Sequence, residues 1–410
     1  MTYTDPLASP PRHDPAPGWG QSLSTGAAGI ALLHIEYAHA GIGGWDTVHQ
    51  WAAAMTRCPV VAHPDACGLF RGAPAVAFVL SAAERPGYAT ALSNLDSHIT
   101  RLTRYRLQQA HERIERGQLP TLREYDLING LTGIGVYLLH QHGKGDLLWD
   151  ILSYLVRLAE PLTVDDQTLP GWWTGNGPAD QPSRDWPGGH ANLGLAHGIA
   201  GPLALLASAM TFGITVPGHA EAIEGICAWL DQWRCGTRYR PWWPGMISQR
   251  EWKARTVQQP GPQRPSWCYG TPGLARALQL AALALANTQR LRLAEDALAG
   301  CIADDTQLAQ LDDASLCHGW AGLVQTTRRV AADAGPGSAL ATLLPHLYTR
   351  WEHDQHRHQL PTSDGMLEGT AGITLTRHTA ADALPASRWD VCLLIAPPTC
   401  LEKPHPEGTQ

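Results

Sequence analysis

The sequence predicts an all-α protein, an α/α toroid of seven helical hairpins, and three observations carry that prediction. A Gly-x-x-Gly motif or a near match recurs along the chain, with steps of 46 residues or more between successive motifs, enough for two helices. An apolar run of residues follows each motif. Between the motifs, segments such as DLLWDILSYLVRLA carry apolar residues at steps of three and four, which is typical of a helix with one buried face. The seven motifs begin at Gly26, Gly72 (with Ala75 in the second slot), Gly130, Gly198, Gly270, Gly319 and Gly369.

Each hairpin is expected to start with an inner helix at its first glycine and to return through an outer helix. An open solenoid would need polar caps at its ends, whereas seven unequal hairpins can close into a ring. We therefore expect one toroid over residues 19–396, with loose tails at 1–18 and 397–410. Residues 161–192 and 236–265 are rich in Pro, Gly and Trp and are predicted not to be helical. They either pack on the ring or form a rim that holds a peptide.

Composition excludes several classes of protein. The chain has 410 residues, 44% hydrophobic and 16% charged, which is typical of a globular protein. A formal net charge of −7 argues against nucleic-acid binding. No apolar run reaches the roughly 18–20 residues of a membrane span, and no secretory signal is present, so the sequence predicts a cytoplasmic protein. The nine scattered cysteines then indicate thiols or metal ligands rather than disulfides.

Candidate functional residues lie just before the motifs. If all inner helices run the same way, their N-termini, with free N–H groups and the positive dipole end, converge on one mouth of the ring. The residue before each first glycine is Thr25, Arg71, Asn129, His197, Tyr269, His318 or Glu368.

Two cysteines occupy the next position back, Cys268 and Cys317, in neighbouring repeats. Packed helices lie about 8–10 Å apart, so both thiols can reach one ion, with His318 as a third ligand. Two thiolates and one imidazole are a good ligand set for zinc, and three protein ligands leave a fourth position open, as in catalytic sites. The histidines of WEHDQHRHQ, by contrast, are expected to lie in a solvated loop: His353, His356 and His358.

The segments SWCYGTPG, LCHGWAG and NLGLAHGIAG resemble the signatures of the lanthionine synthetase C-like cyclases, and the resemblance covers roughly residues 20–380. It implies a seven-fold α/α toroid with one zinc per chain on Cys268, Cys317 and His318. It also implies a cyclase that adds peptide cysteine thiols to dehydroalanine or dehydrobutyrine, closing lanthionine or methyllanthionine rings. The expected partners are a lanthipeptide precursor, with its leader and dehydrated core, a dehydratase and an exporter.

The same resemblance implies catalytic contributions from His197, Asp126, Arg264 and Tyr269. A substrate thiolate adding to a dehydroamino acid produces an enolate, which needs a donor on its oxygen and a proton on the α-carbon. His197 could deliver the proton, Asp126 could orient the imidazole, and Arg264 or the helix N-termini could stabilise the enolate. Each also has a structural interpretation. Asp126 could cap the helix entered at Gly130, Tyr269 could pack beneath the metal loop, and Arg264 could pair with a carboxylate.

Four alternatives stay open on the sequence. A glutathione-transferring relative would share the zinc site but act on dehydroamino acids in proteins. Prenyltransferase β-subunits also place zinc on an α/α toroid, with a different ligand set and a partner subunit. A toroidal glycosidase needs paired carboxylates, and the mouth offers only Glu368 with Asp126 nearby. The last alternative is a non-catalytic zinc-binding scaffold of a peptide-modifying complex.

Overall fold

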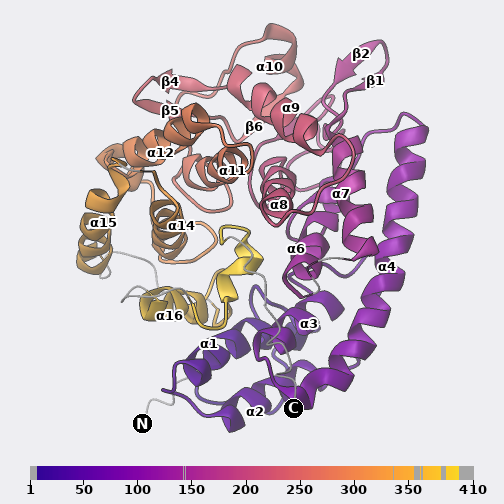
Figure 1. Ribbon diagram of the computed structural model, residues 1–410, viewed down its shortest axis with the longest axis vertical. Coiled ribbons are helices and arrows are strands. Elements are labelled where there is room, and N and C mark those ends of the chain that lie inside the picture. Colours follow the sequence, from indigo (N-terminus) through magenta and orange to yellow (C-terminus); the bar gives the residue numbers. More distant parts are fainter. Residues whose placement is uncertain are drawn as a thin grey trace, which may run out of the picture.

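The predicted α/α toroid is confirmed by a computed structural model, which describes residues 7–141, 143, 145–335, 337–354, 361, 363–379 and 385–396. Each inner helix contacts the next one along the chain, and the last contacts the first, so the ring is closed (Figure 1). The inner helices are α1 (Ala27–His39), α3 (Ala73–Ala82), α6 (Leu131–Gln141), α8 (Ala200–Thr211), α11 (Thr271–Ala284), α14 (Trp320–Ala332) and α16 (Thr370–Thr379).

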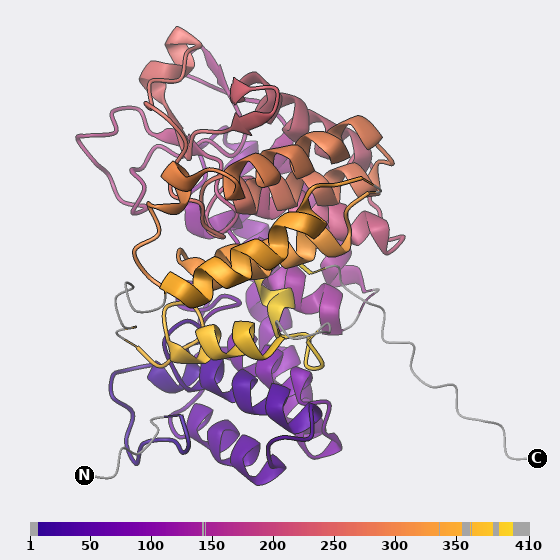
Figure 2. The same cartoon turned by 90° about the vertical axis from the view of Figure 1, so that its left-hand side faces the viewer.

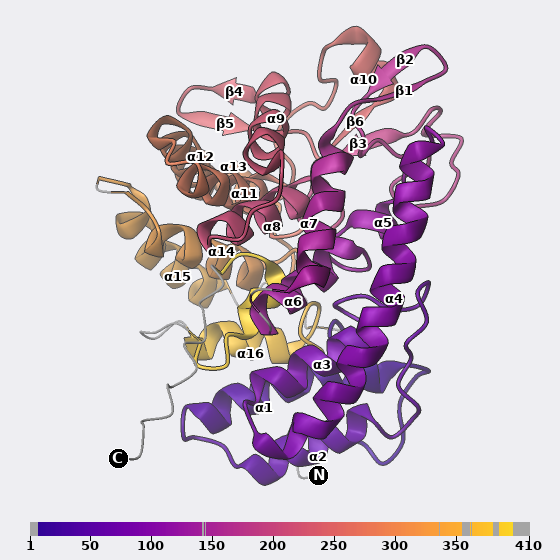
Figure 3. The same cartoon turned by 45° about the vertical axis from the view of Figure 1, so that its right-hand side comes forward.

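An outer layer of helices packs against the inner ring. Its members are α2 (Trp45–Met55), α4 (Ala89–Glu115), α7 (Asp146–Ala159), α9 (His219–Gln232), α12 (Thr288–Ile302) and α15 (Leu340–Asp354). Each contacts the inner helix that precedes it, and the long α4 also runs along α6 and α7 (Figure 3). Seen from the side, the helices of the C-terminal half lie roughly along a common direction (Figure 2). Short helical turns connect these elements: η1 (Trp19–Gln21), η2 (Pro86–Tyr88), α5 (Leu122–Tyr125) and α13 (Asp305–Leu308).

The loops that precede the inner helices are joined by backbone hydrogen bonds in a complete circle. Each loop donates an N–H to a carbonyl of the next loop, and the seventh returns to the first. The seven bonds are Leu23 to Phe70 (3.0 Å), Phe70 to Ile128 (3.5 Å), Leu127 to Ala196 (3.0 Å), Leu195 to Cys268 (3.0 Å), Cys268 to Cys317 (3.2 Å), Cys317 to Leu367 (2.8 Å) and Leu367 to Ser24 (3.0 Å). Because buried backbone groups need partners, this circle fixes all seven loops at one face of the ring.

The Gly-x-x-Gly motif is explained by a close approach of the backbone to itself. The loop folds over the first helical turn, so the second glycine lies beneath a carbonyl six residues earlier. A Cβ atom at Gly273 would lie 2.1 Å from the Trp267 oxygen, and one at Gly322 would lie 2.0 Å from the Leu316 oxygen. No side chain fits at such distances, so glycine is required. The same clash, with a carbonyl oxygen, is found at Gly29, Gly133, Gly201 and Gly372.

The seventh repeat differs from the others in the described residues, because no outer helix follows α16. Residues 385–396, which include the 3-10 helix η4 (Trp389–Leu393), lie in the middle of the ring instead (Figure 1). The fully buried Asp390 accepts hydrogen bonds from Arg329 of α14 at 2.6 and 2.7 Å. The Ile395 carbonyl accepts one from Arg276 of α11 at 2.7 Å. Since each buried charge has a partner, this segment can close the centre of the ring without an unpaired ion.

The two predicted insertions are mostly irregular, as expected, and each adds short strands. The structure forms β1 (Leu162–Val164), β2 (Gln167–Leu169), β3 (His190–Asn192), β4 (Cys235–Thr237), β5 (Arg240–Trp242) and β6 (Met246–Ser248). Strands β1 and β2 pair, as do β4 and β5, and β3 pairs antiparallel with β6, which joins the two insertions.

One part of the second insertion is helical, and there the prediction was wrong. Helix α10 (Gln249–Ala254) begins with a capping box, in which Ser248 and Glu251 exchange side-chain and backbone hydrogen bonds. The Ser-x-x-Glu spacing is the local signal that could have identified it.

The described part of the N-terminal segment packs on the ring. Leu7 is buried, and its carbonyl lies 2.7 Å from Nε2 of His34 on α1. Asp14 pairs with Arg57 at 2.7 Å. The predicted C-terminal tail, 397–410, lies outside the described residues, as do His356 and His358. His353, which was expected in a loop, lies in the last turn of helix α15 instead. Among the helices described, none has the length and apolar character needed to cross a membrane.

Candidate metal and catalytic site

Two cysteines and a histidine meet at the loops that precede α11 and α14. One ligand atom from each of Cys268, Cys317 and His318 lies within 4.8 Å of the others. The bond from the Cys268 N–H to the Cys317 carbonyl, 3.2 Å long, holds the two loops together. Within the part of the chain that the structure describes, this is the only group of three such side chains able to hold a metal ion. The predicted ligands are therefore brought together by the ring.

The two thiols affect each other's ionisation. The hydrogen bond from Cys317 lowers the pKa of Cys268 to about 7; burial opposes this shift, while Ser266, Arg264 and His197 reinforce it. The same hydrogen bond, together with burial, raises the pKa of Cys317 well above its usual value. We assign the first ionisation to the pair rather than to one sulfur, because a single proton bridges them. A cation placed between the sulfurs would favour ionisation of both.

His318 is held by a carboxylate that the sequence analysis missed. Asp313 Oδ2 lies 3.2 Å from Nε2 of His318. The other oxygen of Asp313 accepts the Ser315 N–H at 2.7 Å, which fixes the carboxylate in place. A metal-ligating histidine usually donates its second ring N–H to such a group, which sets the tautomer and the ring orientation. The segment DDAS at 312–315, just before His318, contains two acidic residues, but nothing in their spacing indicates which one turns inward.

His197 and Asp126 form a tight pair beside the thiols. Nδ1 of His197 lies 2.6 Å from Oδ2 of Asp126, which is fully buried, while the His197 side chain is 37% exposed. Burial lowers the pKa of His197, but the hydrogen bond to Asp126 and its charge outweigh burial, and Cys268 adds to them, so the pKa is raised. The imidazole thus faces the mouth and carries a proton more readily than usual.

Asp126 also performs the structural role that was the alternative interpretation. Its Oδ1 accepts the N–H groups of Asn129 at 2.6 Å and Gly130 at 2.8 Å, at the start of α6. One oxygen therefore caps the helix and the other holds the histidine. The two interpretations of Asp126 are compatible.

Tyr269 lies against the sheet that joins the two insertions. Its hydroxyl accepts a hydrogen bond from Asn192 of β3 at 2.9 Å, and its ring fills the space beside Gly194. Burial, with the nearby charges of Cys268 and Asp126, raises its pKa. Asn192 was missed by the sequence analysis, although an Asn two residues before a glycine is a turn signal: its Oδ1 accepts the Gly194 N–H at 2.9 Å.

Arg264 lies at the edge of the site rather than in it. Its guanidinium is 3.5 Å from Asp312, and both side chains are substantially exposed. Its charge nevertheless contributes to the lowered pKa of Cys268. Glu368, at the equivalent position of the last repeat, is exposed, and its charge raises the pKa of Cys317. Asp126 and Asp313 are each paired with a histidine, so neither is the free acid or base that a glycosidase needs.

Comparison with known proteins gives the class. The family model described as lanthionine synthetase C-like protein matches residues 17–394, and the chain belongs to that family. Nisin biosynthesis protein NisC from Lactococcus lactis subsp. lactis is 28% identical over 231 residues, which are 55% of this chain and 54% of that protein. The match thus spans about half the length of the curated relative. The solved structure of a nisin cyclase has the same fold, with a TM-score of 0.75, 22% identity and 93% of each chain covered.

Proposed function

We propose that the chain is a zinc-dependent lanthipeptide cyclase, which adds cysteine thiols of a dehydrated precursor peptide to dehydroalanine or dehydrobutyrine. The observation that carries the proposal is the meeting of Cys268, Cys317 and His318 at the mouth of the ring, with the His197–Asp126 pair beside them. Two sulfur donors and one imidazole suit zinc better than the hard cations that prefer oxygen ligands. Family membership and the relative named for nisin biosynthesis support the same activity.

The residues of the site would divide the reaction between them. Zinc held by the three ligands would supply an open position and lower the pKa of the substrate thiol. His197, with its raised pKa, would give a proton to the α-carbon after the sulfur has added, and Asp126 would keep the imidazole protonated and oriented. Arg264 and the N–H groups at the helix starts would favour negative charge on the enolate oxygen. Tyr269 would form a wall against which the peptide packs.

The activity is tested with a dehydrated precursor peptide that retains its leader. The purified protein is expected to convert free cysteines to thioethers without a change of mass, because addition within one peptide neither gains nor loses atoms. Alkylation of the remaining thiols followed by mass spectrometry measures the conversion, and a zinc chelator should stop it. A dehydrated peptide with serine in place of each cysteine is the matched control.

Two other outcomes would replace the proposal. Gain of the mass of glutathione, when that thiol is supplied, would assign the protein to glutathione transfer. If several dehydrated precursors remain fully alkylatable after incubation with the zinc-loaded protein, the chain is a non-catalytic zinc-binding scaffold instead. The choice therefore depends on a mass measurement that distinguishes all three.

Asp313→Asn is expected to weaken zinc binding without unfolding the ring. The amide still accepts the Ser315 N–H, but it no longer supplies a charged acceptor for His318. Loss of such a partner typically costs about 10–100-fold in metal affinity. Competition with a chromophoric chelator measures the affinity. Asp312→Asn, at an exposed neighbour that pairs with Arg264, is the control, and equal zinc affinities in the two variants would contradict the role of Asp313.

A further inference from the structure

A large open cavity lies on the outer wall, between the end of α9, the β4–β5 hairpin and the start of α12. Its volume is about 1020 Å³. Helix α12 returns from the far end of α11, whose 14 residues extend roughly 21 Å from the metal loop, so the part of the cavity lined by Thr288 is remote from the candidate site. Any ligand of this cavity would therefore bind without touching the reacting groups.

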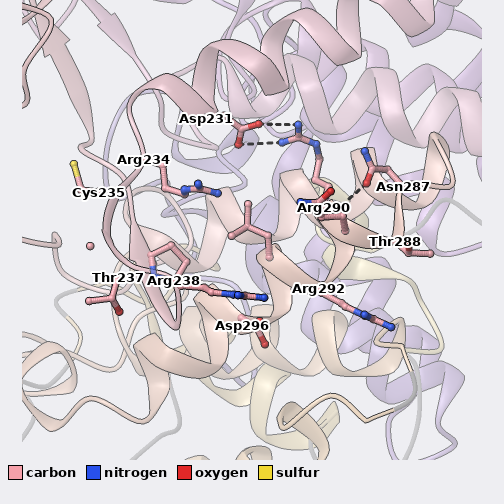
Figure 4. Close-up of a pocket in the computed structure, with 14 residues that line it drawn as sticks. Asp231, Arg234, Cys235, Thr237, Arg238, Asn287, Thr288, Arg290, Arg292 and Asp296 are labelled. Carbon is pink, nitrogen blue, oxygen red and sulfur yellow. Dashed lines mark hydrogen bonds and ion pairs between the residues drawn. The ribbon is translucent and has the colours of Figure 1, made fainter.

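The walls of the cavity are rich in arginine. Arg234 and Arg238 come from the α9 and hairpin side, and Arg290 and Arg292 come from the first two turns of α12 (Figure 4). Two aspartates share the lining, Asp231 and Asp296. The chain as a whole has a net charge of −7, so four arginines around one cavity make this part of the surface locally positive.

The guanidinium groups of three of these arginines have no hydrogen-bonding or ionic partner among the described residues. Only Arg290 is paired, by two parallel hydrogen bonds of 3.2 and 2.8 Å to Asp231, which Figure 4 shows as dashed lines. Arg234, Arg238 and Arg292 are exposed, and the guanidinium of Arg238 lies 6.0 Å from the ring of Tyr239. Tyr239 itself is 74% exposed at the tip of the hairpin. Exposed arginine beside exposed tyrosine is typical of protein recognition surfaces.

The shape and chemistry of the cavity favour carboxylates on an extended chain. The guanidinium fork matches a carboxylate with two hydrogen bonds, and the Arg290–Asp231 pair shows that geometry within this cavity. A volume at the upper end of the range for small-molecule sites accommodates several residues of peptide. The basic groups form one hollow rather than the stripe along which a nucleic-acid backbone would lie.

We propose that this arginine cavity binds an acidic segment of a partner polypeptide. Glutamate or aspartate side chains pair with Arg234, Arg238 and Arg292, and an apolar neighbour packs on Tyr239. The binding involves no covalent step and no metal. It is independent of the proposed cyclase activity, because it can be measured without any reaction.

Fluorescence anisotropy with a fluorescein-labelled hexaglutamate peptide tests the proposal on the full chain. The wild-type protein is expected to bind hexaglutamate and not hexaglutamine, and the affinity should fall between about 50 and 300 mM salt. The triple variant Arg234→Gln, Arg238→Gln, Arg292→Gln should bind roughly tenfold more weakly, because three exposed ion pairs are lost together. Its zinc content and helical circular dichroism should match those of the wild type.

A second triple variant tests whether binding depends on this cavity or only on the overall charge of the protein. Arg104→Gln, Arg184→Gln and Arg250→Gln remove the same charge from exposed arginines elsewhere on the chain, and this protein should bind hexaglutamate as the wild type does. Equal weakening in both triple variants would overturn the proposal, as would unchanged binding in the first. Binding of pyrophosphate or ATP with no binding of hexaglutamate would also overturn it and assign the cavity to phosphate ligands.

Discussion

Cys268→Ala is expected to lose nearly all bound zinc while the ring stays folded. The variant removes one of two sulfur donors from a three-ligand group, and the remaining thiol and imidazole cannot surround the ion. Zinc-binding free energies of roughly 10–16 kcal/mol are shared among three or four ligands, so the loss should be on the order of 100-fold in affinity or more. Metal analysis of the purified protein measures it.

The fold should survive because the Cys268 backbone, not its side chain, joins the loops. Its N–H and carbonyl bond to Cys317 and Leu195, and alanine keeps both bonds. Cys235→Ala, at a half-buried thiol of β4 outside the metal group, is the matched control and should retain zinc. Full zinc occupancy in Cys268→Ala, at the same helical content as the control, would eliminate this site.

The ring could be predicted from the sequence because its defining contact is local. In six of the seven motifs the second glycine meets a carbonyl only six residues away, so the constraint leaves a short and repeated signal, as at Gly273 and Gly322. The filling of the centre by residues 385–396 could not be predicted. Asp390 is 61 residues from Arg329, and no local pattern marks a carboxylate that will be buried against a distant guanidinium.

The residues of the candidate site were also only partly predictable from the sequence. Cys268, Cys317 and His318 were found because equivalent positions in neighbouring repeats must lie side by side. Asp313 and Asn192 were missed, because the fold of each loop decides which polar side chain turns inward. Asp126 could be singled out, but its two roles are separable only in the structure, where one oxygen meets α6 and the other meets His197.

His197→Ala is expected to keep zinc and lose cyclisation. The imidazole is not one of the three grouped ligands, so metal content should match the wild type. Proton transfer by a positioned side chain typically contributes about 10²–10⁴-fold to a rate, and we expect a loss of that order. Alkylation of unreacted cysteines, followed over time by mass spectrometry, gives the rate. His49→Ala, which alters a histidine on α2 far along the chain from the mouth, is the control.

Asp126→Asn tests how the carboxylate acts on His197. The Asn side-chain oxygen can still cap α6, so the fold is expected to remain, but the charge that raises the pKa of His197 is lost. In the wild type the raised pKa means that the pair contributes its full stability below the ordinary histidine pKa of about 6.5, and that this contribution is lost as pH rises through the folded-state value.

The cyclisation rate, which is proposed to need a protonated His197, should show the same pH dependence. It should decline as pH rises through the raised pKa in the wild type, and the decline should begin at lower pH in Asp126→Asn, where burial acts on the imidazole without an opposing charge. NMR titration of the His197 ring gives both pKa values, and the pH dependence of the cyclisation rate should move with them. Coincident pH profiles for the two proteins, or a His197→Ala variant that closes rings at the wild-type rate, would remove the imidazole from the proton transfer.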